Sequence, residues 1–212
     1  MGKINHVEKL TNYKFLNLYN INATNSKGTD ISYYVASRAK NCIELKAINM
    51  KKELRPDAVA IFSFYGEKFD KVVLVKQYRY AIGDYIYEFP AGLVDDNEDI
   101  HTTAIREMKE ETGLEFVPYD GGDDERPFFS SVGMTDECCS TVYGYAKGTP
   151  SVNNQERSEE IEIVIADEKE VKRILKEENV CMKTAYQLQL LLVIWELNQY
   201  GKVEFKGSLK NE

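Results

Sequence analysis

The chain has 212 residues and a formal net charge of −8, and 43% of its residues are hydrophobic and 29% charged. This composition argues against a disordered or repeat-built chain, and the acidic balance argues against nucleic-acid binding, which needs a basic face. No apolar run approaches the ~20 residues of a membrane span, and the N-terminus lacks a signal-peptide core, so we expect a cytoplasmic protein without membrane contact.

The first 55 residues predict a small N-terminal β subdomain. Its candidate strands are rich in Tyr, Val, Ile and Leu. They span residues 13–22, 31–37 and 42–49. A turn-forming stretch from Asn25 to Gly28 separates the first two strands.

Residues 56–212 predict a larger domain that begins at Pro56. Its candidate strands span residues 58–64, 72–77, 141–146 and 160–165, and its later helices span residues 168–177 and 183–199. The first two strands are expected to form a hairpin. Because strands and helices are mixed without a regular βαβ repeat, the expected class is α+β, or mixed α/β.

The strongest helix signal covers residues 100–112. Asn97 and Asp99 are good N-cap residues, and Gly113 suits the left-handed position that follows a helix. Within this helix the apolar residues share one face and three glutamates share the next one.

Glu107, Glu110 and Glu111 make that second face densely negative. Like charges three and four residues apart on a helix repel by about 0.2–0.5 kcal/mol per pair. Two interpretations follow. The face is solvated and eased by Arg106 and Lys109, or its carboxylates bind a hard cation such as Mg²⁺.

A longer pattern favours the second interpretation. From Gly92 to Leu114 the sequence reads GLVDDNEDIHTTAIREMKEETGL. It resembles the Nudix hydrolase signature G-x5-E-x7-R-E-U-x-E-E-x-G-U, in which U is a bulky aliphatic residue. The matching residues are Gly92, Glu98, Arg106, Glu107, Met108, Glu110, Glu111, Gly113 and Leu114. Seven polar or Gly matches coincide by chance below about once in 10⁸ registers.

This resemblance implies a fold, a reaction and a set of roles. The fold is an α/β/α sandwich with a mixed sheet, and the reaction is hydrolysis of a nucleoside diphosphate derivative with Mg²⁺ or Mn²⁺. Glu107 and Glu111 would bind the metal, and Glu110 would be a further ligand or a support. Arg106 would be a structural partner of the acidic cluster, and Ala91 would offer its backbone carbonyl to the metal.

The flanking residues resemble one branch of the family. LVKQYR at residues 74–79 and EFPAG at residues 88–92 are similar to the surround of the box in ADP-ribose pyrophosphatases. In that group the N-terminal subdomain exchanges contacts in a homodimer, so a homodimer is implied. Tyr78 and Arg79 would contact the substrate, with Arg79 at a phosphate or the terminal ribose. Glu88 lies at the edge of the core or faces the ligand.

Downstream, SVGMTDE at residues 131–137 resembles the SPGxSxE loop of the same group, in which a glutamate positions or deprotonates the attacking water. Glu137 is therefore the candidate general base, with Asp136 as a substitute. Val132 stands where the group has Pro. Loop carboxylates offering the same chemistry are Glu156, Glu159 and Glu160.

The expected function is Mg²⁺-dependent cleavage of the pyrophosphate bond of ADP-ribose or a related nucleotide sugar. One alternative is a Nudix pyrophosphatase for another nucleoside diphosphate derivative. The other is a Nudix module that binds a nucleotide metabolite without cleaving it, although such modules usually lack box carboxylates that this chain retains.

Overall fold

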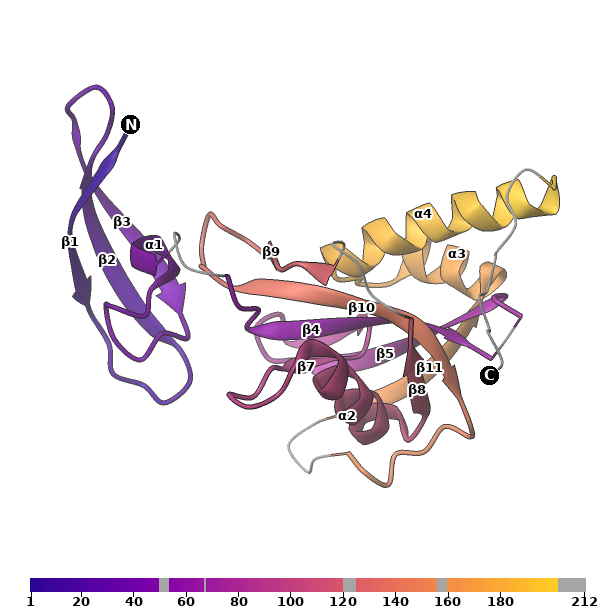
Figure 1. Ribbon diagram of the computed structural model, residues 1–212. Coiled ribbons are helices and arrows are strands. Elements are labelled where there is room, and N and C mark those ends of the chain that lie inside the picture. Colours follow the sequence, from indigo (N-terminus) through magenta and orange to yellow (C-terminus); the bar gives the residue numbers. More distant parts are fainter. Residues whose placement is uncertain (50–53, 67, 120–124, 156–159, 202–212) are drawn as a thin grey trace. The chain divides into compact units, whose positions relative to one another are not determined.

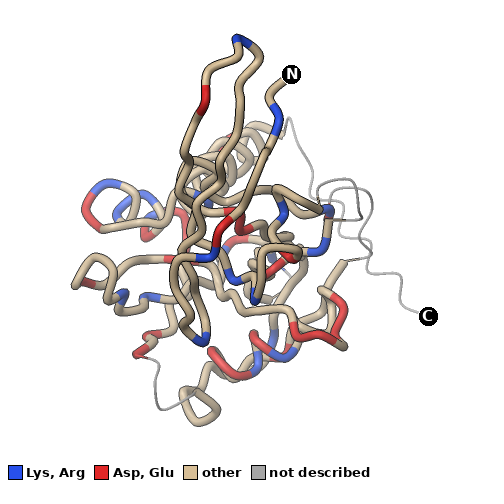
Figure 2. The backbone as a smooth tube through the Cα atoms, turned by 90° about the vertical axis from the view of Figure 1, so that its left-hand side faces the viewer, with Lys and Arg blue, Asp and Glu red and all other residues tan. Residues whose placement is uncertain are grey.

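The computed structural model describes residues 1–49, 54–66, 68–119, 125–155 and 160–201. The chain forms two compact units (Figure 1). The first unit consists of Met1–Ala58 and Arg126–Ser140, and the second consists of Val59–Glu125 and Thr141–Glu212. Figure 2 shows acidic and basic residues interspersed along the chain, so the net negative charge is not confined to one segment.

The first unit is built on a three-stranded antiparallel sheet. Its strands are β1 (Lys3–Lys9), β2 (Asn17–Thr24) and β3 (Asp30–Ser37), in the order β1-β2-β3. One face of β2 and β3 supplies Tyr19, Ile21 and Val35 to a small core, and Leu45 joins them from the segment before the first helix. Between these strands, the side-chain oxygen of Asn25 accepts hydrogen bonds from two backbone N–H groups, which closes the predicted turn.

Two elements of the first unit differ from the sequence prediction. Residues 42–49, predicted as a strand, form a turn and the short helix α1 (Lys46–Asn49). The side-chain oxygen of Asn41 accepts hydrogen bonds from the backbone of Ile43 and Glu44, and this local bonding competes with strand pairing. Strand β1 was not predicted because its residues are mostly exposed and polar.

The second sheet has eight strands. Its main path runs β11-β5-β4-β10-β8, while β6 pairs with β5, β7 with β4 and β9 with β10. The bounds are β4 (Ala58–Tyr65), β5 (Lys71–Arg79), β6 (Asp84–Glu88), β7 (Ala91–Leu93), β8 (Glu115–Pro118), β9 (Phe128–Phe129), β10 (Cys138–Lys147) and β11 (Ile161–Asp167). The expected hairpin of β4 and β5 is present, with Phe64 opposite Val72.

Helices cover both faces of this sheet. On one face α3 (Glu168–Glu177) and α4 (Met182–Gln199) pack against Phe62 and Leu74, and on the other α2 (Ile100–Thr112) packs against Ile61 and Val73. Neighbouring residues of one strand thus enter different cores, as the two-residue period of a strand requires. The architecture is the expected α+β fold with a mixed sheet between helical layers.

The last helix, α4, is apolar on more than its buried side. Leu188, Leu191 and Trp195 face the sheet, whereas Tyr186 and Leu190 are exposed. Among the described residues, no helix is both long and apolar enough to cross a membrane.

Candidate functional site

Helix α2 places the acidic box, and its ends are set by local chemistry. At its start the Asp99 carboxylate accepts hydrogen bonds from the backbone of His101 and Thr102, both at 2.9 Å, so Asp99 and not Asn97 is the N-cap. The hydrogen bonds from Thr102, and then that from His101, hold the pKa of Asp99 below its ordinary value. At its end Gly113 adopts φ 71°, and its N–H bonds the Lys109 carbonyl.

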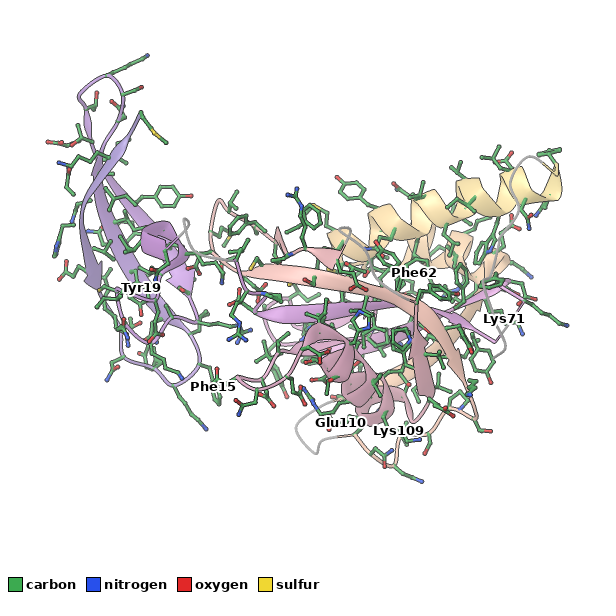
Figure 3. All side chains as sticks on the ribbon, in the orientation of Figure 1. Phe15, Tyr19, Phe62, Lys71, Lys109 and Glu110 are labelled. Atoms are coloured by element: carbon green, nitrogen blue, oxygen red, sulfur yellow. The ribbon has the colours of Figure 1, made fainter. Side chains whose placement is uncertain are left out.

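The buried side of α2 fixes which way the glutamates point. Ala104 and Met108 are fully buried in the core beneath the sheet. Glu111 follows at 3% exposure, whereas the side chain of Glu110 is 41% exposed. Figure 3 shows Lys109 and Glu110 on α2, apart from Phe62, which belongs to the core under α3 and α4.

Arg106 is the hub of the acidic cluster. Its Nη1 donates to Glu107 at 2.7 Å and to Glu110 at 3.0 Å, and its Nε and Nη2 bond the Glu98 carboxylate at 3.0–3.2 Å. The Glu98 hydrogen bonds are the largest cause of the raised pKa of Arg106. One guanidinium therefore offsets the repulsion among three carboxylates.

Strand β7 lies against the same cluster. The backbone N–H of Ala91 donates to the Glu111 carboxylate at 3.2 Å. A Cβ on Gly92 would lie 1.8 Å from the carboxyl carbon of Glu107. Only glycine therefore lets the backbone of β7 approach the Glu107 carboxylate this closely.

The cluster has the donor chemistry of a hard-cation site. The carboxylates of Glu107 and Glu111, with the Ala91 carbonyl on the adjoining strand, are all oxygen donors, and oxygen is what Mg²⁺ prefers. Among the described residues, no group of three or more Asp, Glu, His or Cys side chains is arranged so that it could hold a metal ion. In this arrangement Arg106 is the cation that holds Glu107 and Glu110.

A loop that sequence reasoning missed caps the C-terminal end of α2. The side-chain amide of Gln155 donates to the Glu111 carbonyl at 2.7 Å and to the Ile161 carbonyl at 3.2 Å. Asn154 donates to the Lys109 carbonyl, and the Ser151 N–H to the Thr112 carbonyl. The only signal in the sequence is a run of amide side chains, Asn153-Asn154-Gln155, after the predicted strand.

The residues expected to contact substrate gather on β5 and β6. Arg79 Nε lies 2.6 Å from Glu88 Oε2, and the Glu88 side chain is 17% exposed. The ring of Tyr78 packs edge-on against Tyr80 and Tyr85. The structure thus brings Arg79 and Glu88 together although nine positions separate them in the sequence.

Tyr85 holds one of the alternative loop carboxylates. Its hydroxyl donates to Glu160, and this hydrogen bond is the first cause that raises the pKa of Tyr85 to about 12. The other two alternatives, Glu156 and Glu159, lie outside the described residues.

Glu137, the candidate base, belongs to the first unit. Its Oε1 lies 3.5 Å from Nε of Arg38, and its side chain is 29% exposed. The neighbouring Asp136 accepts the backbone N–H of Lys46 instead. The loop before Glu137 is attached to β3, because Ala36 N–H donates to the Met134 carbonyl and the Tyr33 hydroxyl to the Gly133 carbonyl.

Comparisons with known proteins identify similar chains. An ADP-ribose pyrophosphatase from Bacillus subtilis is 31% identical over 150 residues, which are 66% of this chain and 76% of that protein. An ADP-ribose pyrophosphatase from Saccharomyces cerevisiae is 46% identical over 55 residues, or 26% of this chain and 24% of that protein. A methanol dehydrogenase activator from Bacillus methanolicus is 43% identical over 67 residues, or 31% and 35%. The last two matches span only about a quarter to a third of those relatives.

A solved structure of an ADP compounds hydrolase shares the fold, with a TM-score of 0.65 at 17% identity, covering 95% of this chain and 97% of that one. The NUDIX domain model matches residues 54–184. Because this match covers more than half of the chain, the chain belongs to the NUDIX domain family.

Proposed function

We propose that the protein is a metal-dependent hydrolase that cleaves the pyrophosphate bond of ADP-ribose or a related nucleoside diphosphate sugar. Water adds across the phosphoric anhydride, which yields a nucleoside monophosphate and a sugar phosphate. The observation that carries this proposal is the acidic cluster of Glu98, Glu107, Glu110 and Glu111 beside β7, in which Arg106 bonds the first three carboxylates. Relatives named as ADP-ribose pyrophosphatases support the substrate class.

The metal would be Mg²⁺ or Mn²⁺. Glu107, Glu111 and the Ala91 carbonyl would hold it, with Glu110 as a further ligand or a support. When bound, such an ion neutralises diphosphate charge and lowers the pKa of a bound water. Arg106 keeps the carboxylates gathered, and Gly92 leaves the space that the Glu107 side chain occupies.

Substrate contacts are assigned to Arg79, Tyr78 and Glu88. A guanidinium binds phosphate or ribose oxygens well because its donors form a planar fork. Glu88 accepts from Nε of Arg79, which leaves the terminal nitrogens of the guanidinium directed elsewhere. Glu88 therefore orients Arg79, and the exposed ring of Tyr80 extends the aromatic surface beside Tyr78.

We assign the general base to Glu137. Its carboxylate is held by Arg38 and remains part-exposed, so it is accessible to a water molecule. Glu160 offers the same chemistry, but the Tyr85 hydroxyl already bonds it. Glu156 and Glu159, which follow Gln155 in the sequence, remain further alternatives.

We infer that two chains form a homodimer through residues 1–55, which we assign as the dimerisation subdomain. The support is an exposed, mainly apolar run between β1 and β2, interrupted by Lys14, in which Tyr13 is 73%, Phe15 67% and Leu16 50% exposed. Contiguous exposed apolar surface often marks a protein interface. We also infer a cytoplasmic location, since all four cysteines are free thiols.

The test incubates purified protein with ADP-ribose and Mg²⁺ and separates the products by chromatography. We expect AMP and ribose 5-phosphate from the unaltered protein, and a turnover at least about 100-fold lower for Glu111→Gln, since it removes a metal ligand. Glu115→Gln is the matched control, because Glu115 is an exposed carboxylate four residues further along.

Full turnover by Glu111→Gln would overturn the proposed metal site. If the unaltered protein leaves ADP-ribose intact, a panel of other nucleotide sugars, dinucleotides and nucleoside triphosphates identifies the substrate class. Tight binding of ADP-ribose by calorimetry without any product would instead favour the binding module.

A further inference from the structure

The Glu98 carboxylate accepts hydrogen bonds from two side chains, those of Arg106 and Thr103. Thr103 occupies a position at which the Nudix signature specifies no residue. Thr103 lies in the first turns of α2 and is fully buried. Its Oγ1 donates to Glu98 Oε2 at 2.9 Å, the same oxygen that accepts Nη2 of Arg106 at 3.0 Å. Both contacts hold the pKa of Glu98 below its ordinary value, that of Arg106 first.

This hydrogen bond continues into the acidic cluster. Glu98 bonds Nε and Nη2 of Arg106, and Nη1 of the same guanidinium bonds Glu107 and Glu110. A guanidinium is planar and rigid. The orientation in which Nε and Nη2 of Arg106 bond Glu98 therefore also fixes the direction in which Nη1 points. The rotation of the Glu98 carboxylate therefore affects where the box carboxylates are held.

Burial makes the Thr103 hydroxyl hard to replace. Bulk water does not reach the fully buried Thr103 side chain, so it does not take the place of the hydroxyl there. Among the described residues, a variant without the hydroxyl leaves Arg106 as the side-chain partner that orients the Glu98 carboxylate, which is 21% exposed. The Thr103 backbone is fixed independently, since its N–H bonds the Asp99 carbonyl as a regular part of the helix. The hydroxyl can thus be removed without removing the helix.

We propose that Thr103 is a positioning residue of the metal site, which acts through Glu98 and Arg106 on Glu107 and Glu110. Its effect on catalysis rests on the proposed function. Its effect on metal binding does not, because that binding is measured without nucleotide.

The test compares Thr103→Val with Thr103→Ser. Valine keeps the shape and removes the donor, while serine keeps the donor. Thr102→Val is the matched control, because it removes a similar bond, from Thr102 Oγ1 to Asp99 at 3.0 Å, that does not lead to the cluster. The dissociation constants of Mg²⁺ and Mn²⁺ are measured by calorimetry on protein without nucleotide, with unfolding midpoints in parallel.

We expect Thr103→Val to weaken metal binding about 10-fold, as loss of an outer-shell partner does. Thr103→Ser should stay close to the unaltered protein, and Thr102→Val within about 2-fold of it. With ADP-ribose, Thr103→Val should lower kcat and leave KM nearly unchanged. If the valine variant fails to fold by circular dichroism, Thr103→Ala takes its place with the same expectations.

A lowered unfolding midpoint with unchanged metal affinity and kcat would overturn the proposal, since the hydroxyl would then serve stability alone. An unaltered protein that binds Mn²⁺ but cleaves no nucleotide would contradict the proposed function, while the metal affinities of the Thr103 variants would still decide the role of Thr103.

Discussion

Arg106 shows how a single residue makes an acidic helix face tolerable. On an isolated helix, the repulsion of Glu107 by Glu110 and by Glu111 would cost about 0.2–0.5 kcal/mol per pair. In the folded chain one guanidinium bonds Glu98, Glu107 and Glu110 at 2.7–3.2 Å. The acidic face is therefore not a plain solvated surface, because Arg106 holds Glu107 and Glu110 and the buried Glu111 accepts the Ala91 N–H.

Gly92 carries a prediction at the residue scale. In Gly92→Ala the added Cβ would meet the Glu107 carboxyl carbon at 1.8 Å, so the side chain of Glu107 must move. We expect the metal affinity to fall at least about 10-fold, because the displaced group is the proposed metal ligand. The unfolding midpoint should change little, because Glu107 is not a core side chain. Metal titration by calorimetry measures the affinity.

Gly2→Ala is the control for this variant, since a Cβ at Gly2 meets its nearest neighbour at 3.5 Å, an ordinary contact. Unchanged metal affinity in Gly92→Ala would contradict the assignment of Glu107 as a ligand.

At the scale of elements, α2 is specified by its own ends. Asp99 caps its start and Gly113 ends it with a left-handed backbone, and the helix has the predicted bounds Ile100–Thr112. Helix α3 likewise spans the predicted residues, with Asp167 as its N-cap. Caps and helical periodicity are local information, so the sequence was sufficient for these elements.

The cap of α2 carries a pH-dependent prediction. At pH 7, Asp99→Ala should cost about 1 kcal/mol in the free energy of unfolding, because two backbone N–H groups lose their acceptor. The folded pKa of Asp99 is lowered, so its contribution is present above the unfolded pKa and is lost as the pH falls through the folded value. The difference between variant and unaltered protein should therefore shrink below about pH 3.8.

Urea unfolding at pH 7 and at pH 3 provides the measurement. Asp99→Asn keeps an accepting oxygen and should retain most of the stability at both pH values. Asp96→Ala, an exposed residue of the same loop, is the control for loss of charge alone. A cost that is equal at both pH values would contradict the role of the ionised carboxylate.

Other elements depended on information from outside their own residues. The strands β6 and β8 are short, and each is defined by the strand with which it pairs. β6 pairs with β5 across a turn, and β8 pairs with β10, which is distant in the sequence. Residues 42–49 have the composition of a strand, yet Leu45 enters the small core of the first unit from a turn. Composition alone does not tell a buried turn from a strand.

At the scale of the molecule, helices cover both faces of the sheet. This explains why the sequences of β4 and β5 are nearly continuous apolar runs. Both of their faces are buried, so residues such as Ile61 and Phe62 enter opposite cores. Exposed apolar side chains lie elsewhere, among them Tyr186 and Leu190 on α4 and Tyr13, Phe15 and Leu16 between β1 and β2.

The proposed homodimer is tested at this scale. Light scattering after gel filtration should give about twice the chain mass of 24.3 kDa. Phe15→Glu places a charge on the exposed apolar run and should shift the mass toward that of one chain, with an unchanged unfolding midpoint when measured at low concentration. A single-chain mass for the unaltered protein at high concentration would contradict the dimer.

The sequence by itself determined the features that local rules govern. The spacing from Gly92 to Leu114 indicated the family and the residues of the box, and caps with helical periodicity predicted α2 and α3. These features need no knowledge of distant segments, because a helix brings residues three and four positions apart onto one face.

Only the tertiary structure decided the contacts that join separate segments. Residues 126–140 form one compact unit with the N-terminal residues, Gln155 bonds the Glu111 carbonyl, and the Arg79 guanidinium bonds Glu88. The Thr103 hydroxyl turns away from its own helix to the Glu98 side chain. Each of these contacts depends on where the packed core places two elements, and the pattern of residues within one element carries no record of that position.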